Sequence, residues 1–408
     1  MVNPLHLSGY GVKIKVENMR SRSELVVADG RDGFRQTPMS YHYGPRKIPY
    51  DSVIIDGHSG YISLQALHWL SRNNVPAFVL NFDGKLITSI LPPSPVKADI
   101  RTAQIRAMDD REICFTVARE LVRAKLQRSL DVLGWLDQSY DIRKEKGDAE
   151  HEALGLAKAR NVTEIRVVEG RVAQRYWEAF QSVIPETFLF RARITRSHQN
   201  NATDPVNLAL NYAYGVLEGE VRWAINSVGL EPSAGFLHDF AGYQTKESLV
   251  YDLQEPFRWL CDVTVLEAVE SRTLDLKDFY FIGDDYRYRI EVNAKRRFLG
   301  LLQKSFNSGV RYGKGNYMWD TVIFRKAQEL GRFLLGKSPT LNFSEPKPDL
   351  PQEDTTLLRR RILDLSQNEA GSLGISKSTL HYLRNRARDD RPMKVYGKVS
   401  DRLKLEKA

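Results

Sequence analysis

The chain has 408 residues, which is too long for one compact core and predicts two or three domains. Hydrophobic residues make up 42% of the sequence, enough to fill real cores and to exclude wholesale disorder. The net charge is +9, and residues 356–408 contain thirteen Lys or Arg against six acids. The basic character therefore belongs largely to the C-terminal tail, and it points to a polyanionic partner.

No apolar run approaches the roughly 18–20 residues that a membrane-spanning helix needs, and the N-terminal residues lack the apolar core of a signal peptide. We therefore expect a cytoplasmic protein that has no membrane partner. The two cysteines, Cys114 and Cys261, each lie in an apolar stretch. This placement favours buried thiols over a disulfide framework or a zinc site.

Residues 1–92 predict a small β-rich domain. Short segments rich in β-branched residues are separated by Gly, Asp and Asn, and Asp83-Gly84 has the composition of a hairpin turn. The predicted strands are residues 11–16, 23–27, 52–55 and 75–82. One helix interrupts them, because Ser63 can cap a segment whose leucines recur at helical spacing.

The pattern changes after the proline-rich residues 91–95, which predict a stiff linker. From there, apolar side chains recur every three or four residues, so we expect an all-α domain over residues 97–342. Asp109-Asp110 predicts a break between its first two helices. The later helical patterns cover residues 162–186, 205–228, 248–271, 290–307 and 316–336. Residues 343–354 hold three prolines and four acids, which predicts an exposed linker.

Residues 356–408 predict a basic helical extension. One helical pattern ends near Leu373 and another begins at Ser376, with Gly374 between them, which predicts a helix-turn-helix. The second helix would present side chains that can reach DNA phosphates and base edges: Lys377, Ser378, His381, Arg384 and Arg388. A solvated basic helix without a ligand is the alternative. The predicted fold class is thus α+β, with a β-rich domain, a larger helical domain and this extension.

Three patterns place polar side chains where a helical bundle is normally apolar. Glu169 shares a helix face with Ala173, although an acid in the first turn of a helix would give the same pattern. His238 closes the apolar run GFL, where a hydrogen-bonded histidine is the alternative to a metal ligand. Asp252 and Glu255 are three residues apart, so a helix would place both carboxylates on one side. Their mutual repulsion would then favour a bound cation.

Carboxylates with one imidazole suit Mg²⁺ or Mn²⁺, whereas zinc usually draws more His or Cys ligands. A metal held in this way could polarise a phosphodiester, lower the pKa of a bound water or 3′-hydroxyl, and stabilise the leaving oxygen. Spacing alone does not establish that the fold brings the three patterns together.

Six blocks between about residue 8 and about residue 340 resemble, in the same order, the CRISPR-associated endonuclease and integrase known as the first Cas protein. They are SGYGVKIKVEN, SVIIDGHSGYISLQALHWL, VVEGRVAQRYWEAF, TDPVNLALNYAYGVLEGEV, GLEPSAGFLH and SLVYDLQEPFR. The resemblance implies an N-terminal β domain joined to a helical catalytic domain. It also implies that Glu169, His238 and Glu255 hold the metal, with Asp252 as an auxiliary acid nearby.

The same resemblance implies a homodimer that joins a small partner Cas protein and inserts short double-stranded DNA fragments, or spacers, into a CRISPR array. In that reaction a DNA 3′-hydroxyl attacks a phosphodiester. Two alternatives remain open. One is a stand-alone nuclease of branched DNA repair intermediates that uses the same site. The other is a DNA-binding regulator that acts through the tail, which lies outside the resemblance.

Overall fold

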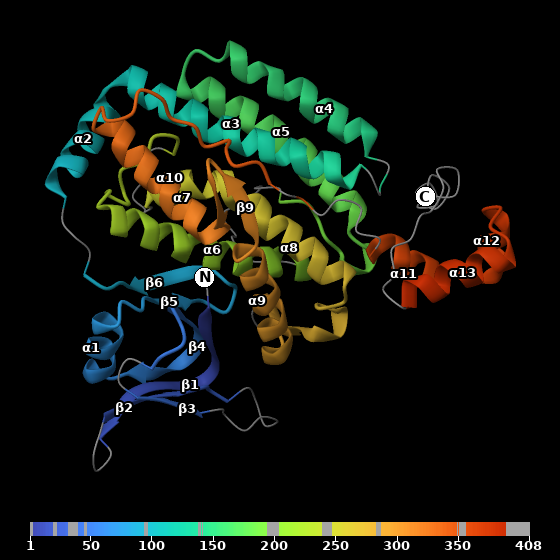
Figure 1. Cartoon of the computed structure of the whole chain (residues 1–408), viewed down its shortest axis with the longest axis horizontal. Coiled ribbons are helices and arrows are strands. Elements are labelled where there is room, and N and C mark those ends of the chain that lie inside the picture. Colours follow the sequence, from blue (N-terminus) through green and yellow to red (C-terminus); the bar gives the residue numbers. More distant parts are fainter. Residues whose placement is uncertain are drawn as a thin grey trace.

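The computed structural model describes residues 3–18, 23–31, 40–44, 47–93, 97–137, 140, 142–193, 204–238, 247–282, 287–348, 350 and 356–388. A six-stranded sheet at the N-terminal end lies beside a larger helical body, and three short helices project from one end of that body (Figure 1). This arrangement confirms the predicted α+β class. Among the described residues, no helix is long and apolar enough to cross a membrane.

The sheet has the strand order β3-β2-β1-β4-β5-β6. Its strands are β1 (Pro4–Asn18), β2 (Ser23–Ala28), β3 (Ser40–Tyr43), β4 (Ser52–Ile62), β5 (Ala77–Leu80) and β6 (Leu86–Ile90). The pairs β1–β4 and β4–β5 are parallel, and the other pairs are antiparallel. The hairpin predicted at Asp83-Gly84 is confirmed: Gly84 has a φ of +81°, which glycine adopts without strain. The short strand β3 was not predicted.

The sheet buries both of its faces. On one face α1 (Leu64–Arg72) packs Ala66 and Leu70 against strand residues. This helix starts where the sequence predicts, because the Ser63 hydroxyl accepts the N–H of Ala66. On the other face three strand residues join the core of the helical body: Ile54, Phe78 and Leu80. The sheet and the body thus share a core, and the division of the chain into separate domains stays a prediction.

Nine α-helices of the described residues form the body. They are α2 (Ala98–Asp109), α3 (Arg111–Leu136), α4 (Arg143–Ala153), α5 (Val162–Val183), α6 (Pro205–Val228), α7 (Ser248–Gln254), α8 (Arg258–Glu270), α9 (Val292–Phe306) and α10 (Trp319–Leu334). The predicted break between the first two is confirmed, since the Asp110 carboxylate caps α3 by accepting the N–H groups of Glu112 and Ile113. Helix α6 is buried along most of its length and packs against α8 and α10.

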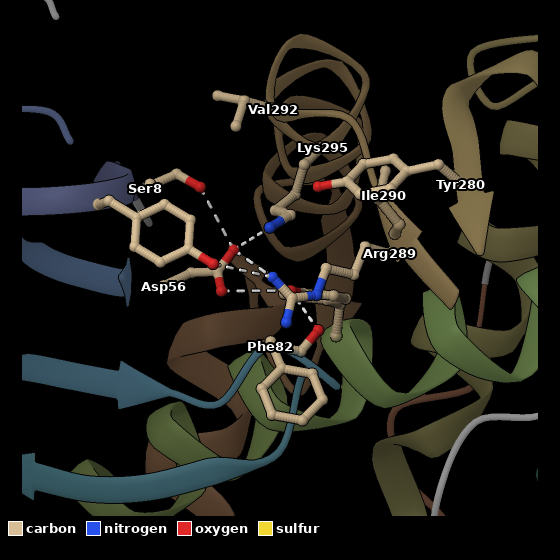
Figure 2. Close-up of a pocket in the computed structure, with 11 residues that line it drawn as sticks. Ser8, Asp56, Phe82, Tyr280, Arg289, Ile290, Val292 and Lys295 are labelled. Atoms are coloured by element: carbon tan, nitrogen blue, oxygen red, sulfur yellow. Dashed lines mark hydrogen bonds and ion pairs between the residues drawn. The ribbon is translucent and has the colours of Figure 1, made fainter. Parts of the chain in front are cut away.

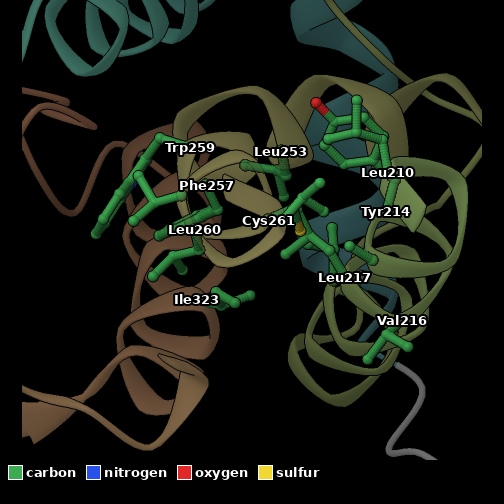
Figure 3. Packing of buried hydrophobic residues seen from close by; sticks show 14 of the residues in the cluster. Leu210, Tyr214, Val216, Leu217, Leu253, Phe257, Trp259, Leu260, Cys261 and Ile323 are labelled. Carbon is green, nitrogen blue, oxygen red and sulfur yellow. The ribbon is translucent and has the colours of Figure 1, made fainter. Parts of the chain in front are cut away.

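Short irregular elements interrupt the body. They are the 3₁₀ turns η1 (Leu154–Lys158), η2 (Glu186–Phe188), η3 (Glu255–Phe257) and η4 (Leu276–Asp278), and the hairpins β7–β8 (Phe279–Ile282 with Arg287–Ile290) and β9–β10 (Gly309–Tyr312 with Gly315–Met318). The all-α prediction missed both hairpins, because each strand has only four residues beside a strong helical pattern. Cys261 lies fully buried in the core near Leu253 and Leu217 (Figure 3), as predicted, whereas Cys114 is half-buried.

The start of the predicted exposed linker is in fact packed on the body. Leu341 and Phe343 are buried in the main core. The buried guanidinium of Arg128, on α3, donates to the backbone carbonyls of Ser344 and Pro346. These carbonyls satisfy a cation that would otherwise be buried without acceptors, so the linker prediction is wrong for this stretch.

The tail forms α11 (Thr356–Asp364), α12 (Gln367–Ser372) and α13 (Lys377–Arg388). It has a small core of its own, made by Ile362, Ala370, Leu373, Ile375, Leu380, Leu383 and Ala387. Gly374 has a φ of +70° and turns the chain between α12 and α13. The predicted helix-turn-helix geometry is therefore present. Residues 389–408 lie outside the described residues.

A buried ion pair ties the sheet to the helical body. Asp56 of β4 contacts the ammonium of Lys295 from α9, and it also accepts a hydrogen bond of 3.2 Å from the Tyr212 hydroxyl of α6 (Figure 2). The side chains of Asp56 and Lys295 are 2% and 8% exposed. A second pair joins Arg296 to Asp29 beside it. These contacts fix the orientation of the sheet on the body.

We expect Asp56→Asn to lower the free energy of unfolding by about 3–5 kcal/mol, because it leaves the Lys295 ammonium buried without its anion. Urea unfolding would measure the loss. Arg171→Gln is the control, since Arg171 is 63% exposed and lies 3.5 Å from Glu152. An exposed pair of this kind contributes less than about 1 kcal/mol. Equal losses in the two variants would contradict the structural role of the buried pair.

Candidate metal centre

The loop that carries His238 is held by one buried carboxylate. Asp252 of α7 is fully buried, and it accepts the backbone N–H groups of Phe236 (2.5 Å), Leu237 (2.9 Å) and His238 (3.1 Å). A Cβ atom at Gly235 would stand 2.8 Å from the Asp252 carboxylate, so only glycine allows this close approach. The GFLH sequence therefore wraps around the acid that follows it on α7.

Four further side chains fix the same loop through its backbone. Gln104 donates to the carbonyl of Ala234 at 2.7 Å, and Arg166 donates to the carbonyl of Leu237 at 2.6 Å. The remaining two contacts come from Ser248, which donates to the carbonyl of Ser233, and Cys114, whose thiol lies 3.4 Å from the carbonyl of Phe236. Helices α2, α3, α5 and α7 thus all position one loop, which makes it rigid.

Asp252 also orients the His238 ring. Its Oδ1 atom lies 2.6 Å from Nδ1 of His238, and the imidazole is 46% exposed. Burial lowers the pKa of His238, but the hydrogen bond and charge of Asp252 outweigh it, so the pKa is raised. A carboxylate on Nδ1 fixes the tautomer and makes Nε2 a stronger electron donor, as in many metal sites. Both Asp252 oxygens are occupied in this way, which makes Asp252 a positioning residue.

The two remaining acids meet from different elements. Glu169 lies in the middle of α5, so the alternative of an acid in a first helical turn is excluded. Glu255 lies in η3, directly after α7, and is buried. The ammonium of Lys125, on α3, contacts Oε1 of Glu169 and lies 2.7 Å from Oε2 of Glu255. Arg258, at the start of α8, lies 3.2 Å from Oε1 of Glu255.

These cations keep Glu255 ionised. Burial alone would raise the pKa of Glu255, but the charges of Arg258, Lys125 and His238 lower it to about 2. Burial lowers the pKa of Lys125, yet the charges of Glu255 and Glu169 outweigh it and raise the pKa. Glu255 and the Lys125 ammonium are therefore both charged at neutral pH.

Arg258 is held from behind by a buried network. Its guanidinium lies over the Tyr214 ring, 5.0 Å from the centroid. The hydroxyls of Tyr214 and Tyr176 both donate to the carboxylate of Asp262, and burial raises the pKa of Asp262 to about 6. Arg193 stacks on the same Tyr214 ring at 4.9 Å. This network holds Arg258 in place, and Arg258 in turn fixes the Glu255 oxygen that does not contact Lys125.

The donor set fits a divalent cation with oxygen and nitrogen ligands. Glu169 and Glu255 already share one cation, and the oriented His238 imidazole lies on the loop before α7. Among the described residues, no three Asp, Glu, His or Cys side chains converge as a ready-made metal cage. Lys125 lies between the carboxylates instead. The sequence patterns missed Lys125, Arg166 and Arg258, although Lys125 continues the four-residue steps of Val117 and Leu121 along α3.

The DNA-contact candidates of the tail lie on α13. Lys377, Ser378, His381 and Arg388 are exposed, and Tyr382 beside them is 55% exposed. Arg384 differs, because its guanidinium donates to the backbone carbonyls of Ile362 and Leu365 at the end of α11. Its contact with DNA stays a prediction, but its position gives it a packing role within the tail.

The family model described as CRISPR associated protein Cas1 matches residues 43–304. The chain belongs to the Cas1 family. This confirms the resemblance drawn from the six sequence blocks, and Glu169, His238, Asp252 and Glu255 all fall inside the matched range.

Two relatives match nearly their whole length. The CRISPR-associated endonuclease Cas1 of Archaeoglobus fulgidus is 29% identical, over 82% of this chain and 96% of the relative. The structure of a casposase bound to integration product is 33% identical with a TM-score of 0.80, over 89% of this chain and 99% of that one. Residues 1–355 alone cannot accommodate a match of that extent, so it includes part of the tail. A Cas1 protein of Thermotoga maritima shares the fold, with a TM-score of 0.63 at 18% identity over 82% and 98% of the two chains.

We expect Asp252→Asn to weaken Mn²⁺ binding by about 10–100-fold, because it removes the carboxylate that orients and polarises His238. A calorimetric titration would measure the affinity. Asp148→Asn is the control, because Asp148 is exposed and forms a long ion pair of 3.9 Å with Arg175. Unchanged Mn²⁺ affinity in Asp252→Asn would contradict the positioning role of this acid.

Proposed function

We propose that this chain is a metal-dependent DNA integrase and nuclease, which joins a DNA 3′-hydroxyl to a phosphodiester of a second DNA. The observation that carries the proposal is the convergence of Glu169 and Glu255 on one cation, together with a His238 imidazole that Asp252 orients. Membership in the Cas1 family and the similarity to a casposase bound to integration product both support it.

In this proposal Glu169, His238 and Glu255 hold Mg²⁺ or Mn²⁺. The bound metal polarises the phosphodiester and lowers the pKa of the attacking hydroxyl. Other side chains of the protein would orient these ligands before DNA binds. Asp252 fixes the His238 tautomer, and Arg258 holds one oxygen of Glu255. Because Glu255 is already ionised at neutral pH, no proton has to leave it when a metal binds.

We propose spacer insertion into a CRISPR array as the biological reaction, carried out in the cytoplasm by a homodimer with a small partner Cas protein. The names of the curated relatives support the CRISPR assignment. A complex that contains Cas1 and Cas2 shares the fold, with a TM-score of 0.65 at 17% identity over 83% of this chain and 35% of that one. A partner of the Cas2 type is therefore the one that we propose to test first.

A second candidate is integration of DNA outside a CRISPR array. The observation that favours it is the casposase match, which is higher in identity than the match to the Archaeoglobus fulgidus Cas1, covers more of this chain and includes part of the tail. In this candidate the helix-turn-helix would contribute to the choice of DNA. The catalytic residues would be the same.

Joining assays with different donor and target DNA would distinguish these candidate functions. Spacer insertion predicts that short duplexes without defined ends join at an array boundary, and that a Cas2-type partner stimulates the joining. The second candidate predicts joining of longer DNA with defined end sequences, without that partner. A nuclease of branched DNA would cut junctions yet join neither donor. Sequencing the joined products would identify the reaction.

We expect Glu169→Ala and chelation by EDTA each to reduce strand transfer by at least ~100-fold, since both remove charge stabilisation of the reacting phosphate. Glu178→Ala is the matched control, because Glu178 lies on the same helix and pairs with Arg175 at the surface. A gel assay of 3′-end joining would measure the rate. Joining that survives both treatments would sink the metal-site proposal.

We expect removal of residues 356–408 to weaken DNA binding and to flatten its dependence on salt. Each lost phosphate contact should reduce the log–log slope by about 0.9 on duplex DNA. The substitution Lys377→Gln tests one contact within the intact tail, and Arg360→Gln on α11 is its charge-matched control. Fluorescence anisotropy over a salt series would measure both. An unchanged slope after truncation would assign the tail to a protein partner instead.

A further inference from the structure

One side chain occupies the position that a shared metal would take. The Lys125 ammonium contacts Oε1 of Glu169 and lies 2.7 Å from Oε2 of Glu255. The Lys125 side chain is 18% exposed, and the Glu255 side chain is 3% exposed. The other oxygen of Glu255 faces Arg258 at 3.2 Å. Lys125 and Arg258 therefore contact different oxygens of the Glu255 carboxylate.

The elements around this contact explain why the lysine is there. Two carboxylates that approach each other in a buried place repel, unless a cation lies between them. Helix α3 packs against both α5, which carries Glu169, and η3, which carries Glu255. Lys125 is thus the cation that the body itself places between the two acids. Its neighbours Ala124 and Leu126 are buried in the core, which fixes its backbone.

We propose that Lys125 is an internal counter-ion that competes with the catalytic metal. Without metal, its ammonium holds the carboxylates of Glu169 and Glu255 together. When a divalent ion binds, the same carboxylate oxygens become its ligands, so the ammonium has to leave them. The measured free energy of metal binding is then the free energy with which the acids bind the ion, less the free energy needed to displace Lys125. This inference rests on the proposed metal site.

Competition gives a signature that a merely structural residue lacks. Removing the ammonium leaves the buried carboxylate of Glu255 and the half-buried carboxylate of Glu169 without their shared cation, so the metal-free protein loses stability. The same change removes a competitor and a repelling positive charge, so metal binding becomes tighter. A residue that only shapes the site would lose stability and lose metal affinity together. Opposite changes in stability and affinity therefore identify the counter-ion role.

The experiment compares Mn²⁺ affinity by calorimetric titration with the melting temperature of the metal-free protein. Lys125→Met removes the charge and keeps the length of the side chain, and Lys125→Arg keeps the charge. Lys146→Met is the matched control, because Lys146 pairs with Asp137 at 3.0 Å on the outside of the body. Glu255→Gln removes a proposed ligand and measures what the metal site itself contributes.

We expect Lys125→Met to bind Mn²⁺ at least tenfold more tightly than the wild type, and to melt several degrees lower without metal. Saturating Mn²⁺ should recover most of that loss. Lys125→Arg should stay near the wild type in both measurements, and Lys146→Met should leave the affinity unchanged. Lys125→Gln provides a second neutral variant, with the same expected direction, if Lys125→Met does not fold.

Affinity that is unchanged or weaker in the neutral variants would overturn the counter-ion role, while the metal site would stand if Glu255→Gln loses Mn²⁺ binding. If neither the wild type nor Lys125→Met binds Mn²⁺, the metal site itself is overturned, and the counter-ion role with it. A wild type that binds no Mn²⁺ beside a Lys125→Met variant that does would support strong competition.

Discussion

The buried carboxylate of Asp252 is the contact on which the site depends. It accepts three consecutive backbone N–H groups and also orients the imidazole that follows them. Without it, the GFLH loop would bury unpaired N–H groups, each of which costs about 1–3 kcal/mol. Because Asp252 and Glu255 lie on adjoining turns, the acid that orients His238 also sets where Glu255 stands. One short segment therefore fixes one proposed ligand, Glu255, directly and another, His238, through a hydrogen bond.

Charge balance explains the rest of the arrangement. The sequence suggests that Asp252 and Glu255 repel each other and share one cation. In the structure each acid has its own partners: Asp252 has backbone N–H groups and His238, and Glu255 has Lys125 and Arg258. The acid that shares a cation with Glu255 is Glu169, which comes from α5. Three-residue spacing cannot reveal this, because it says nothing about which other helix faces the pair.

Much of the fold could be predicted from local patterns, and the failures have physical causes. Hydrophobic periodicity located α5, α6, α9 and α10, since each buries a continuous stripe. The hairpins β7–β8 and β9–β10 were missed because four-residue strands have too few positions to show alternation. The site residues were located by resemblance rather than by spacing. Lys125 could have been noticed as a charge on an apolar stripe, but its partners Glu169 and Glu255 lie 44 and 130 positions further along the chain.

The tail and the site would contribute differently to the recognition and the reaction of DNA. The site lies among α3, α5 and η3, and in the proposed reaction it would supply chemistry that any phosphodiester could undergo. The tail has a separate core and exposes Lys377, Ser378 and His381 on one helix. A sequence preference would therefore come from the tail, from a partner protein, or from the shape of the DNA.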